Sequence, residues 1–363
     1  MTPFTYENFA QKENFFGRSD EINKITSLID TSNNLLLFSK RRMGKSSLIK
    51  KIFDTQKKSI CIYVDIFDIT CPEDFARYIL EAIAKVQKGD LKHIVTKLTK
   101  LFKRITFAIE INPTSAEINY LPKLNNLEFN DAIEEIFQSL FLLAKENKIV
   151  LAIDEFQQIA LFKDKRIDAI LRKYMQENHN ISYIFLGSKR HILAELFMYK
   201  SPLYEMATPM ELLAIQDIDI YNYISKHINI DKETCDYLIE YSKGETKLIQ
   251  HICHILYRDY KKEILISSSK IDTALKEILL SKSSSYNIIF DTLSLPQKKA
   301  FKILTSSINN YFKKETLQKY NILKTSLESA FKQLFKKELI DKENGEYFVP
   351  DRAFELWGRE LLK

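Results

Sequence analysis

A short basic segment ending in Gly-Lys-Ser has the residue types needed to bind phosphate groups. Gly44, Lys45 and Ser46 match the end of the phosphate-binding loop pattern, which links a strand to a helix. In such a loop the backbone N–H groups surround the phosphates, the lysine reaches the β- and γ-phosphates, and the serine hydroxyl is a Mg²⁺ ligand. The first position of the pattern holds Ser39 instead of glycine. A serine fits there if its backbone avoids positive φ, and is strained otherwise.

Two acidic residues follow an apolar run further along the chain. Asp154 and Glu155 come directly after residues 149–153. In a nucleotide site of this type, Asp154 is predicted to hold Mg²⁺, directly or through water, and Glu155 to polarise the attacking water as a general base. The alternative is a strand end that is acidic by chance. Two motifs in the expected order, on the expected elements, favour the nucleotide site.

A third candidate is the polar segment that follows another apolar run, at residues 181–187. Ser188 is predicted to sense the γ-phosphate, and Lys189 or Arg190 to supply positive charge to the transition state. The alternative is a strand-to-helix turn with a serine cap and solvated basic side chains. The sequence supports both interpretations equally.

Alternating strands and helices must position these side chains. Apolar runs predict strands at 35–38, 60–65, 149–155 and 181–188, and helical periodicity predicts helices at 45–53, 72–86, 130–144 and 167–175. Nearly continuous apolar strands that alternate with helices indicate a parallel sheet covered on both faces, so the predicted fold class is α/β. A strand pair within 105–120, broken by a turn at 112–115, follows the lysine-rich stretch 88–104, and this region is predicted to be an insertion.

The pattern changes after about residue 216. Helices replace the strand signal as far as residue 290, with a break predicted at the polar run 281–285. Three further helices then precede two short strands around Asn344-Gly345, which is a preferred hairpin turn. This order predicts a winged helix. The expected domains are a nucleotide-binding core (1–215, with an insertion at about 88–125), a helical lid (216–290) and the winged helix (291–363).

The predicted winged helix is mildly basic. Residues 291–363 contain 14 Lys and Arg against 10 Asp and Glu, and lysines at 324, 332, 336 and 337 lie on or next to its third helix. Such side chains contact DNA phosphates in helix-turn-helix proteins. Apart from Gln333, this helix lacks the residues that read bases, so specific base readout is not indicated. Winged helices also bind proteins, and the sequence leaves duplex DNA and a protein partner open.

Composition limits where the protein functions. The 363 residues carry a net charge of +6, which permits a polyanionic partner without requiring one. Four scattered cysteines without a CxxC pair favour a reducing compartment. The first residues do not resemble a signal peptide, and the apolar runs are far shorter than the ~20 residues of a membrane span. We therefore expect a cytoplasmic protein without a membrane partner.

Several motifs together resemble the prokaryotic archaeal-type P-loop ATPases of the STAND/AAA+ superfamily. The motifs are Phe16-Gly17-Arg18, residues 40–48, residues 152–157, residues 185–188 and Ser201-Pro202-Leu203-Tyr204. The likeness covers nearly the whole chain and implies a P-loop core, a helical lid and a C-terminal winged helix. It implies ATP and Mg²⁺ as cofactors, with Phe16–Arg18 near the adenine. The predicted nucleotide-binding residues are Phe16, Gly17, Arg18, Arg42, Met43, Gly44, Lys45, Ser46 and Ser47; Ser46 and Asp154 bind the metal; Glu155, Lys45 and Ser188 are catalytic.

Two departures from that family bear on activity. Ser39 stands where the family usually has glycine, and Glu205-Met206 where it commonly has Gly-Arg. ATP binding survives both changes more readily than fast hydrolysis does. The sequence therefore predicts an ATP-binding, nucleotide-dependent switch with slow Mg²⁺-dependent hydrolysis. The alternatives are a nucleotide-binding interaction module with little hydrolysis and an ATP-regulated DNA-binding protein. An oligomer, and an arginine supplied by a neighbouring subunit, stay open.

Overall fold

The computed structural model describes residues 2–10, 12–86, 102, 105–111, 118–123, 128–306, 310–343 and 345–361. These residues form two compact units. The core unit comprises Arg18–Ser39 and Gly44–Leu213. The C-terminal unit comprises Ala214–Lys363 together with Met1–Gly17 and Lys40–Met43.

A five-stranded parallel sheet organises the core unit. In sheet order its strands are β2 (Ser59–Asp65), β5 (Lys148–Asp154), β6 (Ile181–Gly187), β1 (Leu35–Phe38) and β7 (Thr208–Glu211). Every pairing in this sheet is parallel, and β1 lies between β6 and β7. The predicted α/β fold class is confirmed.

Strand β7 was not predicted from the sequence. It contains Pro209, and Met210 is its buried residue. A proline cannot donate to a strand ladder, which confines it to edge strands or strand ends. A short edge strand of this kind lacks the apolar run that marks the four central strands.

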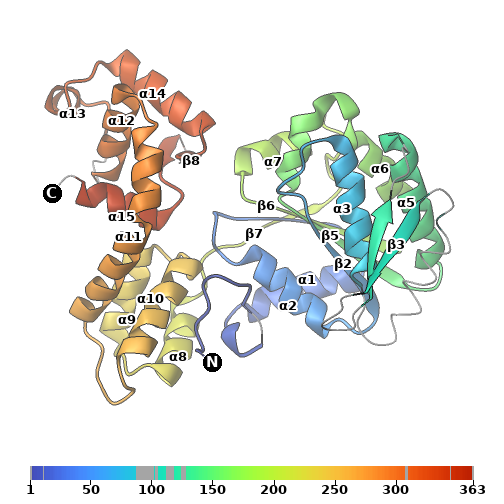
Figure 1. Ribbon diagram of the computed structural model, residues 1–363, viewed down its shortest axis with the longest axis horizontal. Helices are drawn as coiled ribbons and strands as arrows, with labels where there is room; N and C mark the ends of the chain where they lie inside the picture. Colours follow the sequence, from blue (N-terminus) through green and yellow to red (C-terminus); the bar gives the residue numbers. More distant parts are fainter. Residues whose placement is uncertain are drawn as a thin grey trace. The chain divides into compact units, whose positions relative to one another are not determined.

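Helices cover both faces of the sheet (Figure 1). On one face lie α1 (Ser19–Asp30) and α2 (Lys45–Thr55), and on the other α3 (Pro72–Ala84), α5 (Phe129–Ala144) and α6 (Ile167–Glu177). Alternate residues of β5, such as Leu151 and Ile153, belong to the same hydrophobic cluster as the buried faces of α3, α5 and α6. The 3₁₀ segment η3 (Phe156–Lys165) follows β5, and α7 (Arg190–Phe197) follows β6.

The predicted insertion contains an antiparallel hairpin, β3 (Thr106–Ile111) and β4 (Ile118–Lys123). This confirms the strand pair expected within 105–120. The turn at 112–115 and most of the lysine-rich stretch 88–104 lie outside the described residues.

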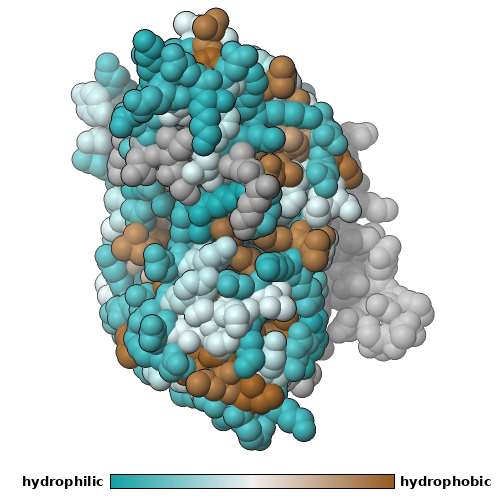
Figure 2. Space-filling view, turned by 90° about the vertical axis from the view of Figure 1, so that its left-hand side faces the viewer, coloured by the Kyte–Doolittle hydropathy of each residue, from teal (hydrophilic) through white to brown (hydrophobic). Residues whose placement is uncertain are grey.

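The C-terminal unit is mainly helical. Its elements are η1 (Lys12–Asn14), α8 (Asp217–His227), α9 (Lys232–Ser242), α10 (Thr246–Asp259), α11 (Ser268–Asp291), α12 (Leu295–Thr305), α13 (Lys314–Lys319), α14 (Lys324–Lys336), β8 (Asp341–Glu343), β9 (Glu346–Phe348) and α15 (Arg352–Glu360). One hydrophobic cluster joins residues from α8 through α15. On the described part of the face drawn in Figure 2, hydrophilic residues separate the groups of hydrophobic ones.

The prediction of a helix break at residues 281–285 is wrong, because α11 continues through these residues. Ile278, Leu279 and Tyr286 are buried at a spacing of seven to eight residues, which keeps them on one face of a helix. The Ser281 hydroxyl donates to the carbonyl oxygen of Ile278 at 2.8 Å, within the helix. Tertiary burial of this face therefore outweighs the polar run.

The predicted winged helix is confirmed: α12, α13 and α14 precede the antiparallel pair β8–β9. Gly345 in the hairpin turn has φ 89°, a conformation that favours glycine, whereas Asn344 lies outside the described residues. The final helix α15 was not predicted. It packs closely, since a Cβ at Gly358 would lie 2.7 Å from the Phe301 ring.

Two properties bear on the expected compartment. All four cysteines are free thiols. Within the described ranges, no helix is long and apolar enough to cross a membrane.

Candidate nucleotide-binding site

Three parallel strands of the core unit end at the same edge of the sheet. In the strand register, Phe38 of β1 pairs with Gly187 of β6, and Ile153 of β5 pairs with Phe185 of β6. The next residues are Ser39, Ser188 and Asp154. Crevices at the carboxyl ends of parallel strands are where open α/β sheets bind ligands, so the fold brings the predicted motifs to one edge.

The phosphate-loop residues lie at the start of α2. Gly44, at the N-cap of this helix, has φ 90°, which a side chain rarely adopts. Lys45 is buried, and its ammonium donates to the Ser39 hydroxyl at 3.0 Å. Positive φ angles in the loop occur at Arg42 and Gly44 but not at Ser39. The backbone condition for serine at the first position is therefore met.

The Ser46 hydroxyl donates to Oδ2 of Asp154 at 2.5 Å, which joins the loop to the end of β5. Asp154 is buried, and its Oδ2 also accepts from the Tyr63 hydroxyl of the neighbouring strand β2. Its Oδ1 accepts from the Glu155 backbone N–H at 2.9 Å. Burial, and to a lesser extent the negative charge of Asp154, raises the pKa of Tyr63. The Tyr63 hydroxyl therefore stays protonated and remains a donor. Sequence reasoning missed Tyr63, which looked like one more strand residue.

Glu155 adopts φ 55°, and its carboxylate is held by two neutral donors. The Gln157 amide nitrogen and the Ser188 hydroxyl both donate to its Oε2, the latter at 3.5 Å. Gln157 is only 2% exposed. A Cβ at Gly187 would lie 2.3 Å from Gln157 Oε1, so glycine there leaves room for this amide. Sequence reasoning missed Gln157, although it lies two residues after Glu155.

The basic residues after Ser188 are placed differently. Lys189 is the N-cap residue of α7. Arg190 is exposed, pairs with Glu211 of β7 at 2.9 Å, and lies over the Phe38 ring.

The segment expected near the adenine is divided between the units. In the C-terminal unit, the Phe16 ring stacks on Tyr223 with centroids 4.1 Å apart. Gly17 has φ 63°, and a Cβ there would lie 2.7 Å from Ile215 Cγ2. In the core unit, Arg18 is buried and pairs with Glu21 at 2.7 Å. Burial lowers the pKa of Arg18, and the Glu21 hydrogen bond opposes this.

Arg42 lies in the C-terminal unit and pairs with acids there. Its guanidinium is 2.5 Å from Asp351 and 3.5 Å from Glu245. Burial raises the pKa of Glu245 to about 7, and the Arg42 charge opposes that rise. Met43 is also buried in this unit, whereas Ser47 is in α2 of the core unit.

Glu205-Met206, the second departure from the family pattern, lies in the core unit. Glu205 is exposed with φ 58°, and Met206 packs against the hydrophobic cluster there.

The chemistry of the pair Ser46–Asp154 fits Mg²⁺, which prefers hard oxygen ligands and is usually held by one or two protein groups plus phosphate oxygens. No cluster of three or more His, Cys, Asp or Glu that could hold a metal ion occurs in the described part of the chain.

Comparisons with known proteins agree with this organisation. Residues 29–194 match a family described as an AAA domain, and residues 284–360 match one described as a probable winged helix domain. The fold resembles the Walker-type ATPase PABY2304 of Pyrococcus abyssi (17% identity, TM-score 0.68, covering 99% of this chain and 100% of that one). It also resembles the Aeropyrum pernix ORC2 protein, solved as ADPNP-ADP complexes (12% identity, TM-score 0.56, covering 99% and 97%). No curated protein matches.

The chain therefore contains a P-loop AAA-type domain followed by a C-terminal winged helix, on a P-loop NTPase fold. These matches agree with the predicted P-loop core and C-terminal winged helix. At these identities the structural likeness establishes the fold alone.

Proposed function

We propose that this protein binds ATP with Mg²⁺, hydrolyses it slowly, and uses the bound nucleotide as a switch. The observation that supports this most strongly is the arrangement at the carboxyl edge of the core sheet. There the Ser46 hydroxyl donates to Asp154 at 2.5 Å and the Ser188 hydroxyl to Glu155 at 3.5 Å, while Lys45, next to Ser46, donates to Ser39 at 3.0 Å. The STAND subtype, a cytoplasmic location and the capacity to oligomerise belong to the same proposal.

Each side chain has a role that its surroundings support. The Lys45 ammonium, now on the neutral Ser39 hydroxyl, would transfer to the β- and γ-phosphates. Ser46 and Asp154 would hold Mg²⁺, which neutralises phosphate charge when bound. Glu155 would orient and deprotonate the attacking water, and Ser188 would sense the γ-phosphate.

Slow turnover follows from what surrounds Glu155. Gln157 and Ser188 both donate to one carboxylate oxygen. Hydrogen bonds to the charged form of a carboxylate stabilise it and weaken it as a base. The same contacts favour the second candidate function, a nucleotide-binding interaction module with little hydrolysis.

The test compares Lys45→Ala with Lys57→Ala, an exposed lysine just after α2. We expect Lys45→Ala to weaken Mg²⁺-ATP binding about 100-fold or more in calorimetry, because a buried charge-assisted contact is lost. Lys57→Ala should bind like the wild type. If Lys45→Ala binds normally, the loop does not hold phosphate and the proposal fails.

Phosphate release separates the two candidates. In a slow ATPase, Glu155→Gln should reduce turnover about 100-fold while ATP stays bound, because an amide cannot accept the proton. Wild-type turnover no faster than that of Glu155→Gln would favour the interaction module.

We also propose that the winged helix is the output module and that its partner is duplex DNA. Lys324, Lys332, Lys336 and Lys337 are all exposed on α14 or directly after it. Exposed lysines of this kind suit phosphate contacts, whereas the cores of protein interfaces are depleted in charge and enriched in aromatic residues.

A further inference from the structure

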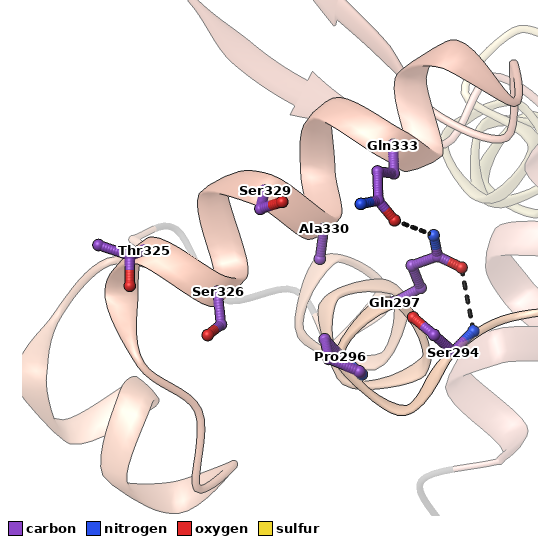
Figure 3. Close-up of a pocket in the computed structure, with 8 residues that line it drawn as sticks. All are labelled: Ser294, Pro296, Gln297, Thr325, Ser326, Ser329, Ala330 and Gln333. Carbon is purple, nitrogen blue, oxygen red and sulfur yellow. Dashed lines mark hydrogen bonds between the residues drawn. The ribbon is translucent and has the colours of Figure 1, made fainter.

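A polar groove of about 310 Å³ opens on the winged helix between the start of α12 and one side of α14. Figure 3 shows the side chains that line it. Six of them are polar: Ser294, Gln297, Thr325, Ser326, Ser329 and Gln333. A proline and an alanine complete the lining, which includes no carboxylate and no aromatic ring.

A directed chain of hydrogen bonds fixes one amide at this groove. The backbone N–H of Ser294 donates to Gln297 Oε1 at 3.0 Å. A backbone N–H is only a donor, so the atom that accepts it must be the amide oxygen of Gln297. The amide nitrogen of Gln297 therefore faces Gln333 and donates to its Oε1 at 2.5 Å.

These hydrogen bonds also fix the orientation of the exposed amide of Gln333. With its oxygen facing the buried Gln297, the amide nitrogen of Gln333 points into the groove, as Figure 3 shows. Gln297 is 4% exposed, so packing holds the orientation. A surface glutamine is normally free to rotate and can present either atom, whereas this one presents N–H.

The groove therefore offers an oriented N–H beside several hydroxyls. A ligand rich in acceptors, with no donors of its own to satisfy, suits such a lining. The phosphodiester backbone has this chemistry. Phosphorylated peptides are bound by arginine clusters, and single strands by aromatic stacking, and neither residue type lines the groove.

Neighbouring charges favour the same ligand. Lys332 and Lys336 are exposed on α14, three residues from Ser329 and Gln333 respectively. Residues three apart are neighbours on a helix surface. The neutral donors and the lysines thus lie side by side on one helix.

We propose that this groove binds the sugar–phosphate backbone of duplex DNA, with Gln333 as a neutral donor and Gln297 as the residue that positions it. The inference rests on duplex DNA as the partner of the winged helix. It adds which surface makes the contact and predicts binding without base readout.

Gln297→Glu tests the orientation with an almost isosteric change. A glutamate keeps the hydrogen bond from Ser294, because Ser-x-x-Glu is itself a favoured helix start. Its second oxygen can only accept, so Gln333 must turn its nitrogen inward and its oxygen toward the groove. Gln318→Glu, on the exposed side of α13 and outside the groove, adds the same charge and is the matched control.

The measurement is binding of a short fluorescein-labelled duplex of mixed sequence to the full chain, over a range of salt concentrations. We expect Gln297→Glu to bind at least tenfold, and Gln333→Ala about three- to tenfold, more weakly than the wild type, with Gln318→Glu nearly unchanged. Because a neutral donor displaces no counterion, Gln333→Ala should leave the salt slope unchanged, whereas Lys332→Ala should reduce it by about one. Unfolding midpoints should show that Gln297→Glu stays folded.

Two outcomes would overturn the inference. If the wild type binds duplex but Gln297→Glu binds no more weakly than Gln318→Glu, the groove is not the contact surface, and DNA as the partner still stands. If the wild type binds no duplex, both fail, while the ATP proposal is judged separately by Lys45→Ala.

Discussion

The two halves of the phosphate loop satisfy their charges in different ways. Lys45, in the core unit, donates to the neutral hydroxyl of Ser39, and the carboxylate of Asp154 accepts from the hydroxyls of Ser46 and Tyr63. Arg42, in the C-terminal unit, pairs directly with Asp351. The contacts named in the first half come from neutral hydroxyls, whereas the contact named in the second half is an ion pair.

This difference suggests separate roles for the two aspartates: Asp154 in binding a cation and Asp351 in stabilising the fold. Burying a charge costs free energy unless an opposite charge or hydrogen bonds compensate. Neutral donors hold Asp154 in position without cancelling its charge, so it keeps its attraction for a cation. Asp351 has its charge compensated by Arg42 and therefore contributes to the folded state of its own unit.

Replacing each aspartate by asparagine should produce the largest effects and separate the two roles. For Asp154→Asn we expect Mg²⁺-dependent turnover to fall at least ~100-fold, with little change in the urea unfolding midpoint, because a metal ligand loses its charge. For Asp351→Asn we expect the free energy of unfolding to fall by about 1–2 kcal/mol, since Arg42 keeps only the more distant Glu245, and turnover to stay within about threefold. If Asp154→Asn unfolds at a lower urea concentration than Asp351→Asn, the assignment of Asp154 to metal binding and of Asp351 to stability is wrong.

Local patterns explain why much of this could be predicted. Gly44-Lys45-Ser46 and Asp154-Glu155 are short motifs joined to apolar strands, and the parallel sheet follows from the alternation of strands and helices. The nucleotide-binding roles of individual residues, and the bounds of the three domains, stay predictions. The winged helix was predictable because its three helices and its hairpin turn are contiguous in the chain.

What could not be predicted depends on distant contacts. Tyr63 reaches Asp154, and Gln297 reaches Gln333, only after their elements pack together. The partner of Arg42 is more than 300 residues away in the sequence. The continuity of α11 depends on Tyr286 being buried beyond the polar run. No local spacing encodes these contacts.

Glu245 should make the stability of the C-terminal unit depend on pH. Its pKa is raised to about 7, chiefly by burial, against an unfolded value near 4.5. The protonated form therefore stabilises the fold fully below pH 4.5, and this stability is lost as pH rises through 7. Between pH 5 and 8 we expect the free energy of unfolding of the wild type to fall by about 2 kcal/mol relative to Glu245→Gln.

The wild type must be compared with Glu245→Gln because a histidine in the same unit changes the free energy of unfolding with pH in the opposite direction. Burial lowers the pKa of His251 to about 4, so its contribution is lost as pH falls below 6.5. His251 is present in both proteins and cancels. A flat difference between them across pH 5 to 8 would mean that Arg42 keeps Glu245 ionised, as it does Asp351.

The smallest expected effect concerns the Ser39 hydroxyl, which accepts a hydrogen bond from Lys45. In the free protein this buried ammonium donates to Ser39, and a nucleotide phosphate must replace that hydrogen bond. Ser39→Ala removes the bond from the free state only, so it should destabilise the free protein by about 1 kcal/mol and tighten Mg²⁺-ATP binding about two- to fivefold in calorimetry. Ser39→Thr keeps the hydroxyl and should bind like the wild type. Weaker binding by Ser39→Ala would show that the hydroxyl stays engaged in the nucleotide complex, and the neutral partner of Lys45 would then be part of the bound site.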